Sequence, residues 1–202
     1  TGIAGFSDLT ARHRASRRPG VESIHGQMPA AFRFGDDAEE EAPSSESLRQ
    51  ALFGELERID LPPHPYNIPG EASGRLAGGN LAVICAAAGT LEELRTDTPT
   101  VLFIEEVGEF LFRIDRMMQS LERSGRLRTL RAVVVGHFTD MMGGERFGVE
   151  DPCEVLDAYL RPLGIPVIYG FPAGHEDPNL SLYLGREVTV SVGTQGASLL
   201  FR

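Results

Sequence analysis

Apolar side chains recur at helical spacing in one segment near the middle of the chain. Over residues 110–124 they stand three or four positions apart, on one face of a helix: Leu111, Ile114, Met118 and Leu121. Gly125 follows, where a glycine commonly ends a helix. The spacing predicts an amphipathic helix that buries this face.

Most of the remaining chain alternates between short apolar runs and helical patterns. The apolar runs predict buried strands over residues 2–6, 21–26, 100–106, 131–138 and 165–171. The segments between them predict helices over residues 8–18, 48–58, 80–88 and 152–160. Two alternating segments, 187–193 and 197–202, predict a closing hairpin. This order of elements predicts an α/β fold with an antiparallel element at its end.

Two segments lack any periodic pattern. Residues 36–47 (DDAEEEAPSSES) are acidic and contain serine and proline, which predicts a solvated, mobile loop. Residues 61–74 carry four prolines, and we interpret them as a linker. The chain is therefore divided into a first unit at 1–60 and a second unit at 75–202.

Composition and charge remove several classes of function. The 202 residues carry a formal net charge of −10, so we expect no binding to nucleic-acid phosphates or to anionic membranes. No apolar run reaches the length of a membrane span. Cys85 and Cys153 stand in apolar surroundings, which predicts two buried free thiols. Histidine or cysteine pairs at metal-ligand spacing and phosphate-binding glycine motifs are absent, so we expect neither a metal nor a cofactor.

Ser7 stands between a predicted strand and a predicted helix, a position that suits a nucleophile. A sharp turn there can expose its hydroxyl and direct the N–H of Asp8 at a bound carbonyl. Gly5 leaves room for such a turn, but Leu9 replaces the last glycine of the usual motif. The alternative is that Ser7 only caps the helix, and the local pattern alone favours this alternative.

Two acids, Glu105 and Glu106, end the predicted strand over 100–106. Side chains alternate along a strand, so one acid can turn into a site while the other meets solvent or a partner. An exposed strand end is an equally good interpretation.

His175 lies in a loop just beyond the predicted strand over 165–171, where a general base can be held on a rigid rim. Two other histidines compete for this role. His137 either sits in the core or lines the same edge, and His25 stands at a loop start where it can border a pocket. Serine, acid and histidine, in this order, are the parts of a catalytic triad.

Seven segments resemble, in order, the signature segments of one known family. They are GFSDLTA (5–11), IHG (24–26), GGNL (78–81), LFIEEVGE (102–109), FRIDRMM (112–118), VVVGHF (133–138) and PVIYGFPAGHEDPNLSLYLG (166–185). The family is the LD-carboxypeptidases, and the resemblance spans nearly the whole chain.

The resemblance implies roles for single residues. Ser7 matches the family's nucleophile, Glu105 its glutamate and His175 its histidine. The backbone N–H of Asp8 matches an oxyanion donor, and Glu106 replaces an aspartate that is usual in the family.

Three further residues receive roles from the same resemblance. Asn80 is implied as a substrate contact. Arg113 and Arg116 are implied either as structural residues or as ligands for a carboxylate, with equal weight.

The family's fold joins an N-terminal, flavodoxin-like nucleophile domain to a C-terminal swivelling β/α domain. Residues 1–60 would then end the first domain, and residues 75–202 would form the second. The implied activity is that of a serine carboxypeptidase, which hydrolyses the amide between an L-centre and a terminal D-residue. The typical reaction removes D-alanine from a murein stem tetrapeptide during peptidoglycan recycling. The resemblance also implies a cytoplasmic, metal-free homodimer with a muropeptide as substrate.

Family chains carry a further stretch before the nucleophile strand, with a loop that supplies a second oxyanion donor. We expect such a segment to be needed by residues 1–202 for folding and activity. Two other functions are compatible with the motifs: a hydrolase like the microcin C self-immunity proteins, which cleaves peptidyl-nucleotide adducts, and a non-catalytic muropeptide-binding module. A purely structural α/β domain would leave Ser7, Glu105 and His175 too far apart for successive hydrogen bonds.

Overall fold

The computed structural model of residues 1–202 describes residues 2–17, 21–28 and 38–202. Its helices are α1 (Thr10–Arg17), α2 (Ala38–Phe53), α3 (Leu81–Ala86), α4 (Leu111–Arg123), α5 (Gly144–Phe147) and α6 (Pro152–Leu160). The 3₁₀ turns among the described residues are η1 (Ser7–Leu9), η3 (Arg126–Thr129) and η4 (Arg161–Leu163). Within the described part of the chain, every helix is too short or too polar to cross a bilayer.

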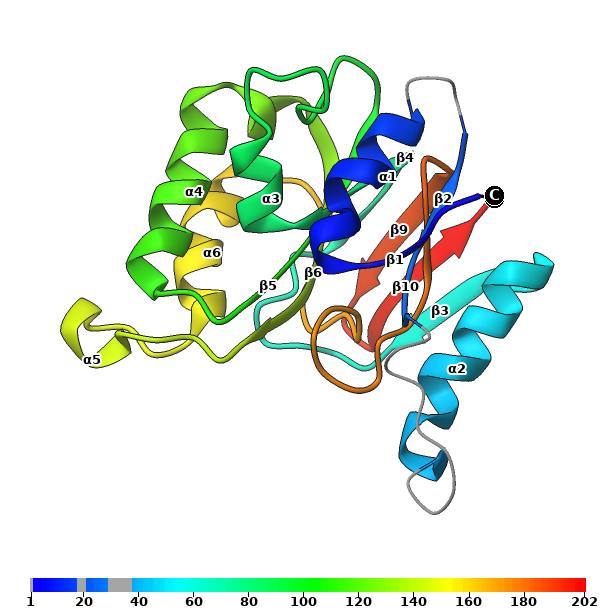
Figure 1. Ribbon diagram of the computed structural model, residues 1–202. Coiled ribbons are helices and arrows are strands. Elements are labelled where there is room, and N and C mark those ends of the chain that lie inside the picture. Colours follow the sequence, from blue (N-terminus) through cyan, green and yellow to red (C-terminus); the bar gives the residue numbers. More distant parts are fainter. Residues whose placement is uncertain (1, 18–20, 29–37) are drawn as a thin grey trace.

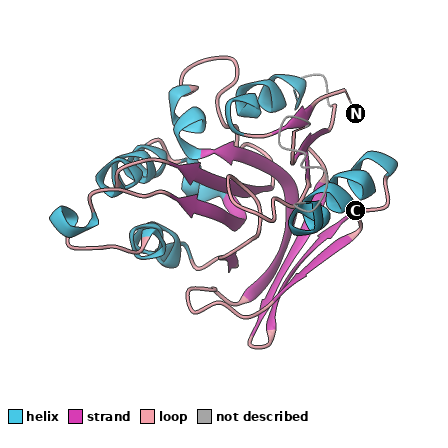
Figure 2. Ribbon diagram, turned by 60° about the horizontal axis from the view of Figure 1, so that its bottom comes forward, coloured by secondary structure: helices cyan, strands magenta, loops and turns pink. Residues whose placement is uncertain are grey.

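Seven strands form the larger of two sheets. Their order is β3 (Arg58–Leu61), β10 (Gly196–Phe201), β9 (Glu187–Gly193), β4 (Gly70–Asn80), β5 (Thr100–Val107), β6 (Leu130–Thr139) and β7 (Val167–Ile168). The strands from β4 to β7 are parallel, whereas β9 and β10 run antiparallel to their neighbours. Figure 2 shows how the sheet curves from its parallel half toward its antiparallel half. The predicted α/β class with a closing hairpin is therefore confirmed.

Three short strands form the second sheet, in the order β1 (Ala4–Gly5), β2 (Ser23–His25) and β8 (Leu182–Leu184). β1 and β2 are parallel, and β8 is antiparallel to β2. This sheet joins the first described residues to a segment near the end of the chain. Its first strand, β1, leads through Phe6 into Ser7.

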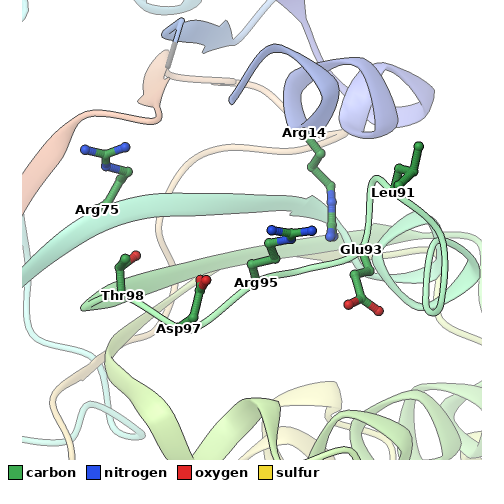
Figure 3. Close-up of a pocket in the computed structure, with 7 residues that line it drawn as sticks. All are labelled: Arg14, Arg75, Leu91, Glu93, Arg95, Asp97 and Thr98. Atoms are coloured by element: carbon green, nitrogen blue, oxygen red, sulfur yellow. The ribbon is translucent and has the colours of Figure 1, made fainter. Parts of the chain in front are cut away.

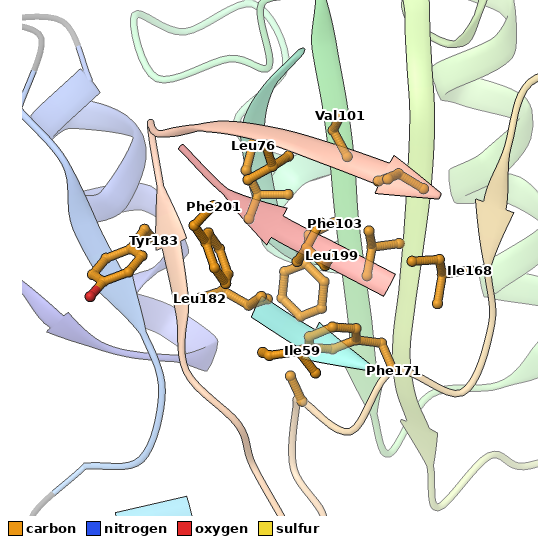
Figure 4. Packing of buried hydrophobic residues seen from close by; sticks show 14 of the residues in the cluster. Ile59, Leu76, Val101, Phe103, Ile168, Phe171, Leu182, Tyr183, Leu199 and Phe201 are labelled. Atoms are coloured by element: carbon orange, nitrogen blue, oxygen red, sulfur yellow. The ribbon is translucent and has the colours of Figure 1, made fainter. Parts of the chain in front are cut away.

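The alternation of side chains along the parallel strands divides the core into two layers. On β5, Leu102 and Ile104 pack into the layer covered by α3, α4 and α6 (Figure 1). Val101 and Phe103 point to the opposite layer, which also holds residues of α2 and of the small sheet (Figure 4). The predicted helix over 110–124 is confirmed, and its buried residues are the four that the spacing selected: Leu111, Ile114, Met118 and Leu121.

The segment predicted as a mobile acidic loop is mostly helical. Helix α2 begins at Ala38 and includes Pro43, so the prediction for 36–47 is wrong within the described residues; 36 and 37 lie outside them. The buried face of α2 runs through Ser44, Ser47, Leu48 and Ala51. In the first half of α2, serines occupy the buried positions where apolar residues would be expected. Their hydroxyls are satisfied there because they accept hydrogen bonds from backbone N–H groups. A pattern of apolar residues therefore cannot reveal this half of the helix.

The predicted linker over 61–74 is shorter than expected. Leu61 still belongs to β3, and β4 begins at Gly70, so only residues 62–69 connect the two strands. The first half of β4 is largely exposed and pairs with β9 through backbone hydrogen bonds, which need no apolar side chains. Because β3 pairs with β10, the boundary predicted between 60 and 61 falls inside a strand of the large sheet.

Two smaller predictions change, and one strand was missed. The strand predicted over 165–171 is reduced to β7, and β8 was not predicted. Cys85 and Cys153 are free thiols, as expected, but both are only half-buried.

Candidate active site

Glu105 and His175 meet at the carboxyl end of the parallel strands. Glu105 lies near the end of β5 and is fully buried, with 0% of its surface exposed. Its Oε2 atom lies 2.8 Å from Nδ1 of His175, across 70 residues of sequence. The structure therefore brings together two of the three residues that the sequence predicted as a triad.

The charges of this pair depend on burial and on the hydrogen bond between them. Burial raises the pKa of Glu105, and the bond to His175 opposes that rise. Burial lowers the pKa of His175, but the bond to Glu105 and its charge outweigh this and raise that pKa overall. When Nδ1–H donates to Glu105, Nε2 is left as the ring nitrogen that can accept a proton. The pair therefore has the chemistry of an oriented general base.

The loop that carries His175 is held from two sides. The N–H of Gly174 donates to Oδ1 of Asn179 at 3.1 Å, and the N–H of Glu176 donates to Nδ1 of His137 at 3.3 Å. Gly174 has φ +141°, and a Cβ atom there would lie 3.2 Å from Cβ of Glu105. His137 thus lines the same edge as His175, one of the two positions that the sequence allowed.

Ser7 is the first residue of the 3₁₀ turn η1, which follows β1 and leads into α1, and its backbone is strained. Its φ is +61°, a left-handed value that costs a non-glycine residue free energy and that marks functional turns. Phe6 is the N-cap of η1, and no side-chain hydrogen bond caps this turn. Gly5 allows the turn, because a Cβ atom there would lie 2.2 Å from Cδ1 of Leu9.

Helix α1 is fixed against β1 and against β4, which is the neighbour of the strand that carries the two acids. Nε2 of His13 lies 2.8 Å from the carbonyl oxygen of Gly5, directly before the turn. The N–H of Asn80 donates to Oγ1 of Thr10 at 3.0 Å. A Cβ atom on Gly79 would lie 2.4 Å from the same oxygen, so glycine is needed for α1 to approach β4 this closely.

The contact between the turn and the histidine runs through Phe6. The Phe6 ring meets the His175 ring edge-on, with the centroids 4.9 Å apart. Among the described residues, no hydrogen bond joins Ser7 to His175. Catalytic hydrogen bonds are often long without substrate and tighten when it binds. The structure thus links Glu105 to His175 directly and places Ser7 next to a residue that touches His175.

The predicted substrate contact, Asn80, has a structural role in this state. Its side chain caps α3 by accepting the N–H of Val83 at 3.1 Å, and it donates to Glu106 Oε1 at 2.7 Å. Glu106 is buried and also accepts the N–H of Ala82 at 2.7 Å. The sequence allowed the second acid to meet either solvent or a partner, and in the structure Glu106 is bonded to protein groups.

Arg113 and Arg116 lie on α4, and their contacts are local. Arg113 pairs with Glu109 at 3.4 Å, and the Arg116 guanidinium lies over the Phe112 ring at 5.0 Å. Within the described part of the chain, neither arginine bonds to Glu105 or His175. A role for either arginine in binding a carboxylate stays a prediction.

His25 lies in the core, next to the candidate site. It is fully buried, and its ring lies 6.0 Å from the Phe6 ring and 4.8 Å from the Phe103 ring. Burial, followed by the nearby histidines, lowers its pKa to about 3. His25 therefore sits behind Phe6 as a fully buried, neutral ring.

The two histidines on either side of Phe6 are expected to titrate in opposite directions from the ordinary value of 6.5. His175 should bind its proton above that value, because Glu105 stabilises the cation. His25 should stay neutral down to about pH 3, because its cation would be buried without a countercharge. Long-range ¹H–¹⁵N NMR spectra recorded from pH 4 to 9 would show this, with a His25→Gln variant for assignment. A His25 signal that titrates near pH 6 would contradict the described packing.

Figure 3 shows a surface cavity of about 240 Å³ whose lining includes neither Glu105 nor His175. Its lining residues are Arg14, Arg75, Leu91, Glu93, Arg95, Asp97 and Thr98. Arg75 pairs with Thr100 at the start of β5, whereas Asn80 pairs with Glu105 near its end. The cavity is thus at the opposite end of the strands from the candidate site. Elsewhere, no cluster of three or more metal-ligating side chains occurs in the described ranges 2–17, 21–28 and 38–202.

The chain is similar to known proteins of one family. Residues 73–190 match the model of the LD-carboxypeptidase C-terminal domain. A probable murein peptide carboxypeptidase from Bacillus subtilis is 30% identical over 96% of this chain and 60% of its own length. The microcin C7 self-immunity protein from Escherichia coli is 28% identical over 64% of this chain and 37% of its own length.

A solved structure extends the likeness to the fold. The crystal structure of muramoyltetrapeptide carboxypeptidase from Oxalobacter formigenes has a TM-score of 0.87 at 26% identity, over 98% of this chain and 67% of that one. The chain spans about 60% of the length of the first curated relative. The family model covers more than half of the chain, including Glu105 and His175. The chain belongs to the LD-carboxypeptidase family.

Proposed function

We propose that this chain carries the catalytic residues of a serine LD-carboxypeptidase that removes the terminal D-alanine from murein stem tetrapeptides. The observation that carries the proposal is the contact between the buried Glu105 and the partly exposed His175, 2.8 Å apart, beside the strained turn at Ser7. An oriented base and a strained serine have no evident structural purpose, and strain of this kind collects at active sites. The relatives' names, murein peptide and muramoyltetrapeptide carboxypeptidase, support the substrate class.

In the proposed reaction, Oγ of Ser7 attacks the carbonyl carbon before the terminal D-residue. Nε2 of His175 takes the serine proton and then passes it to the leaving amine as the C–N bond breaks. Glu105 keeps the ring oriented and stabilises its cation. The N–H of Asp8 binds the oxyanion. Water, activated by the same histidine, then hydrolyses the acyl-enzyme and restores Ser7.

The substrate assignment is tested by the release of free D-alanine from a purified L-Ala-D-Glu-diaminopimelate-D-Ala stem, using the protein as the cell makes it. The matched control is the same peptide ending in L-alanine. Release from the D-terminated peptide alone is expected. Equal cleavage of both peptides, or of neither, would reject the LD-carboxypeptidase proposal. Binding of the stem without release would favour a muropeptide-binding module.

A second candidate reaction is the cleavage of a peptidyl-nucleotide amide. The similarity to the microcin C7 self-immunity protein favours it. The same three residues would perform it, because the bond cleaved is also an amide. Incubation with an aminoacyl sulfamoyl adenosine, with the nucleoside product measured, separates the two candidates.

The family resemblance adds two features to the proposal: a cytoplasmic site of action and a homodimer. Size-exclusion chromatography with light scattering tests the dimer. A monomeric mass at micromolar concentration would remove it from the proposal.

A further inference from the structure

Helix α2 reaches the His175 loop through a chain of two buried hydrogen bonds. Oγ of Ser44 accepts the N–H of Asn179 at 2.8 Å, although the two residues are 135 positions apart. Oδ1 of Asn179 then accepts the N–H of Gly174 at 3.1 Å. Ser44 is 0% exposed and Asn179 is 5% exposed, so water does not compete for either bond. This series of hydrogen bonds ends at Gly174, the residue directly before His175.

Two further bonds attach the same face of α2 to the segment that follows the loop. Oγ of Ser47 accepts the N–H of Ser181 at 2.8 Å, and the hydroxyl of Tyr183 donates to the carbonyl of Ala51 at 2.8 Å. The three helix residues stand three and four positions apart, so they share one face. That face therefore lies along residues 179–183 and fixes them in register.

The loop needs such a partner because its backbone is irregular. Between β7 and β8, few of its N–H groups can join a sheet ladder, and a buried N–H must find an acceptor elsewhere. The serine hydroxyl supplies one for Asn179. The orientation of Asn179 in turn decides whether its side chain can hold Gly174.

Gly174 transmits any displacement directly to the catalytic pair. A Cβ atom on Gly174 would lie 2.9 Å from Cβ of His137 and 3.3 Å from Oε2 of Glu105. The backbone of Gly174 is therefore packed between these two side chains. A small shift of this residue must change the position of His175 relative to Glu105.

We infer that Ser44 is a positioning residue for His175, acting through Asn179 and Gly174, although α2 supplies no reacting group. The inference rests on the proposed function for its kinetic test. Ser47 makes the same kind of bond on the same helix, but to Ser181, beyond the loop. Ser47 therefore has a structural role and serves as the matched control.

The test compares Ser44→Ala with Ser47→Ala in the full protein. Both variants should lose similar thermal stability, because each leaves one buried N–H without its acceptor. Only Ser44→Ala should lower kcat, by about ten- to a hundredfold with little change in KM, since misplacement of a catalytic group by about 1 Å has effects of this size. Equal effects of the two variants on kcat would overturn the inference.

A second readout does not depend on turnover. In Ser44→Ala, the NMR titration of His175 should move toward the ordinary histidine value, because its bond to Glu105 is loosened. Ser47→Ala should leave it unchanged. If the wild-type protein cleaves no stem peptide, the proposed function fails, but this titration still decides the role of Ser44. No shift in Ser44→Ala would overturn the inference.

Two more variants keep the test decisive if Ser44→Ala folds poorly. Ser44→Cys keeps the size of the side chain and offers only a weak sulfur acceptor, so it should show the same changes at smaller amplitude. Asn179→Ala removes the second link. The Ser44→Ala/Asn179→Ala double variant should then resemble Asn179→Ala alone, whereas additive losses in kcat would contradict a single chain of bonds.

Discussion

Replacing Ser7 with glycine is expected to abolish hydrolysis and to raise the stability of the protein in the same variant. The loss follows from the removed hydroxyl, which no neighbouring group replaces. The gain follows from the φ of +61°, which glycine adopts freely and serine does not. Relief of this strain should add about 1–2 kcal/mol to the free energy of unfolding.

Ser7→Ala separates the two effects. It also lacks the hydroxyl, so its kcat should fall by about six orders of magnitude, as in other serine hydrolases. It keeps a Cβ atom in the left-handed region, so its stability should remain close to that of the wild type. Urea unfolding of the three proteins, beside the D-alanine assay, measures both quantities. If Ser7→Gly is less stable than Ser7→Ala, the turn is not strained as described.

Replacing Glu105 with glutamine is expected to lower kcat by about 10³- to 10⁴-fold without unfolding the protein. Glutamine has the same shape, but it cannot fix the tautomer of His175 or stabilise its cation, and a comparable change in another triad has this effect. The pKa of His175 should also fall, because the bond and charge of Glu105 raise it. The acid limb of kcat/KM should therefore move to lower pH in the variant, while the maximum falls.

Glu106→Gln provides the matched control on the adjacent residue. Glu106 accepts bonds from the side chain of Asn80 and from the N–H of Ala82. A glutamine amide has one acceptor oxygen, so one of these buried donors loses its partner at a cost of about 1–3 kcal/mol. Glu106→Gln should thus lower stability while changing kcat far less than Glu105→Gln does. The reverse pattern, with the larger kcat loss in Glu106→Gln, would exchange the roles assigned to the two acids.

The sequence predicted those parts of the fold in which apolar side chains do the packing. The face of α4 and the strand at β5 follow directly from their periodicity. The pairing of Glu105 with His175 followed from the family resemblance, since periodicity alone left an exposed strand end equally possible.

The elements that were missed are held by backbone bonds or by small polar side chains. The first half of β4 carries glycines and exposed residues, and the first half of α2 turns serines toward the core. The hydroxyl of the buried Ser44 accepts the N–H of Asn179, 135 residues later. No local pattern contains that information, and the role of Asn80 as a helix cap was hidden for the same reason.

The order of strands in the large sheet has a consequence for how the protein folds during synthesis. β3 and β4 follow one another in the chain, yet they do not pair with each other; the hairpin β9–β10, which comes later in the chain, stands between them. Until that hairpin has been synthesised, β3 lacks its neighbour β10 and β4 has one open edge, and such edges invite wrong pairing. β8, which pairs with β2 in the small sheet, is also made after them. Pairings between residues so distant in sequence form slowly. The nascent chain therefore depends on β9 and β10 to close the large sheet from the middle.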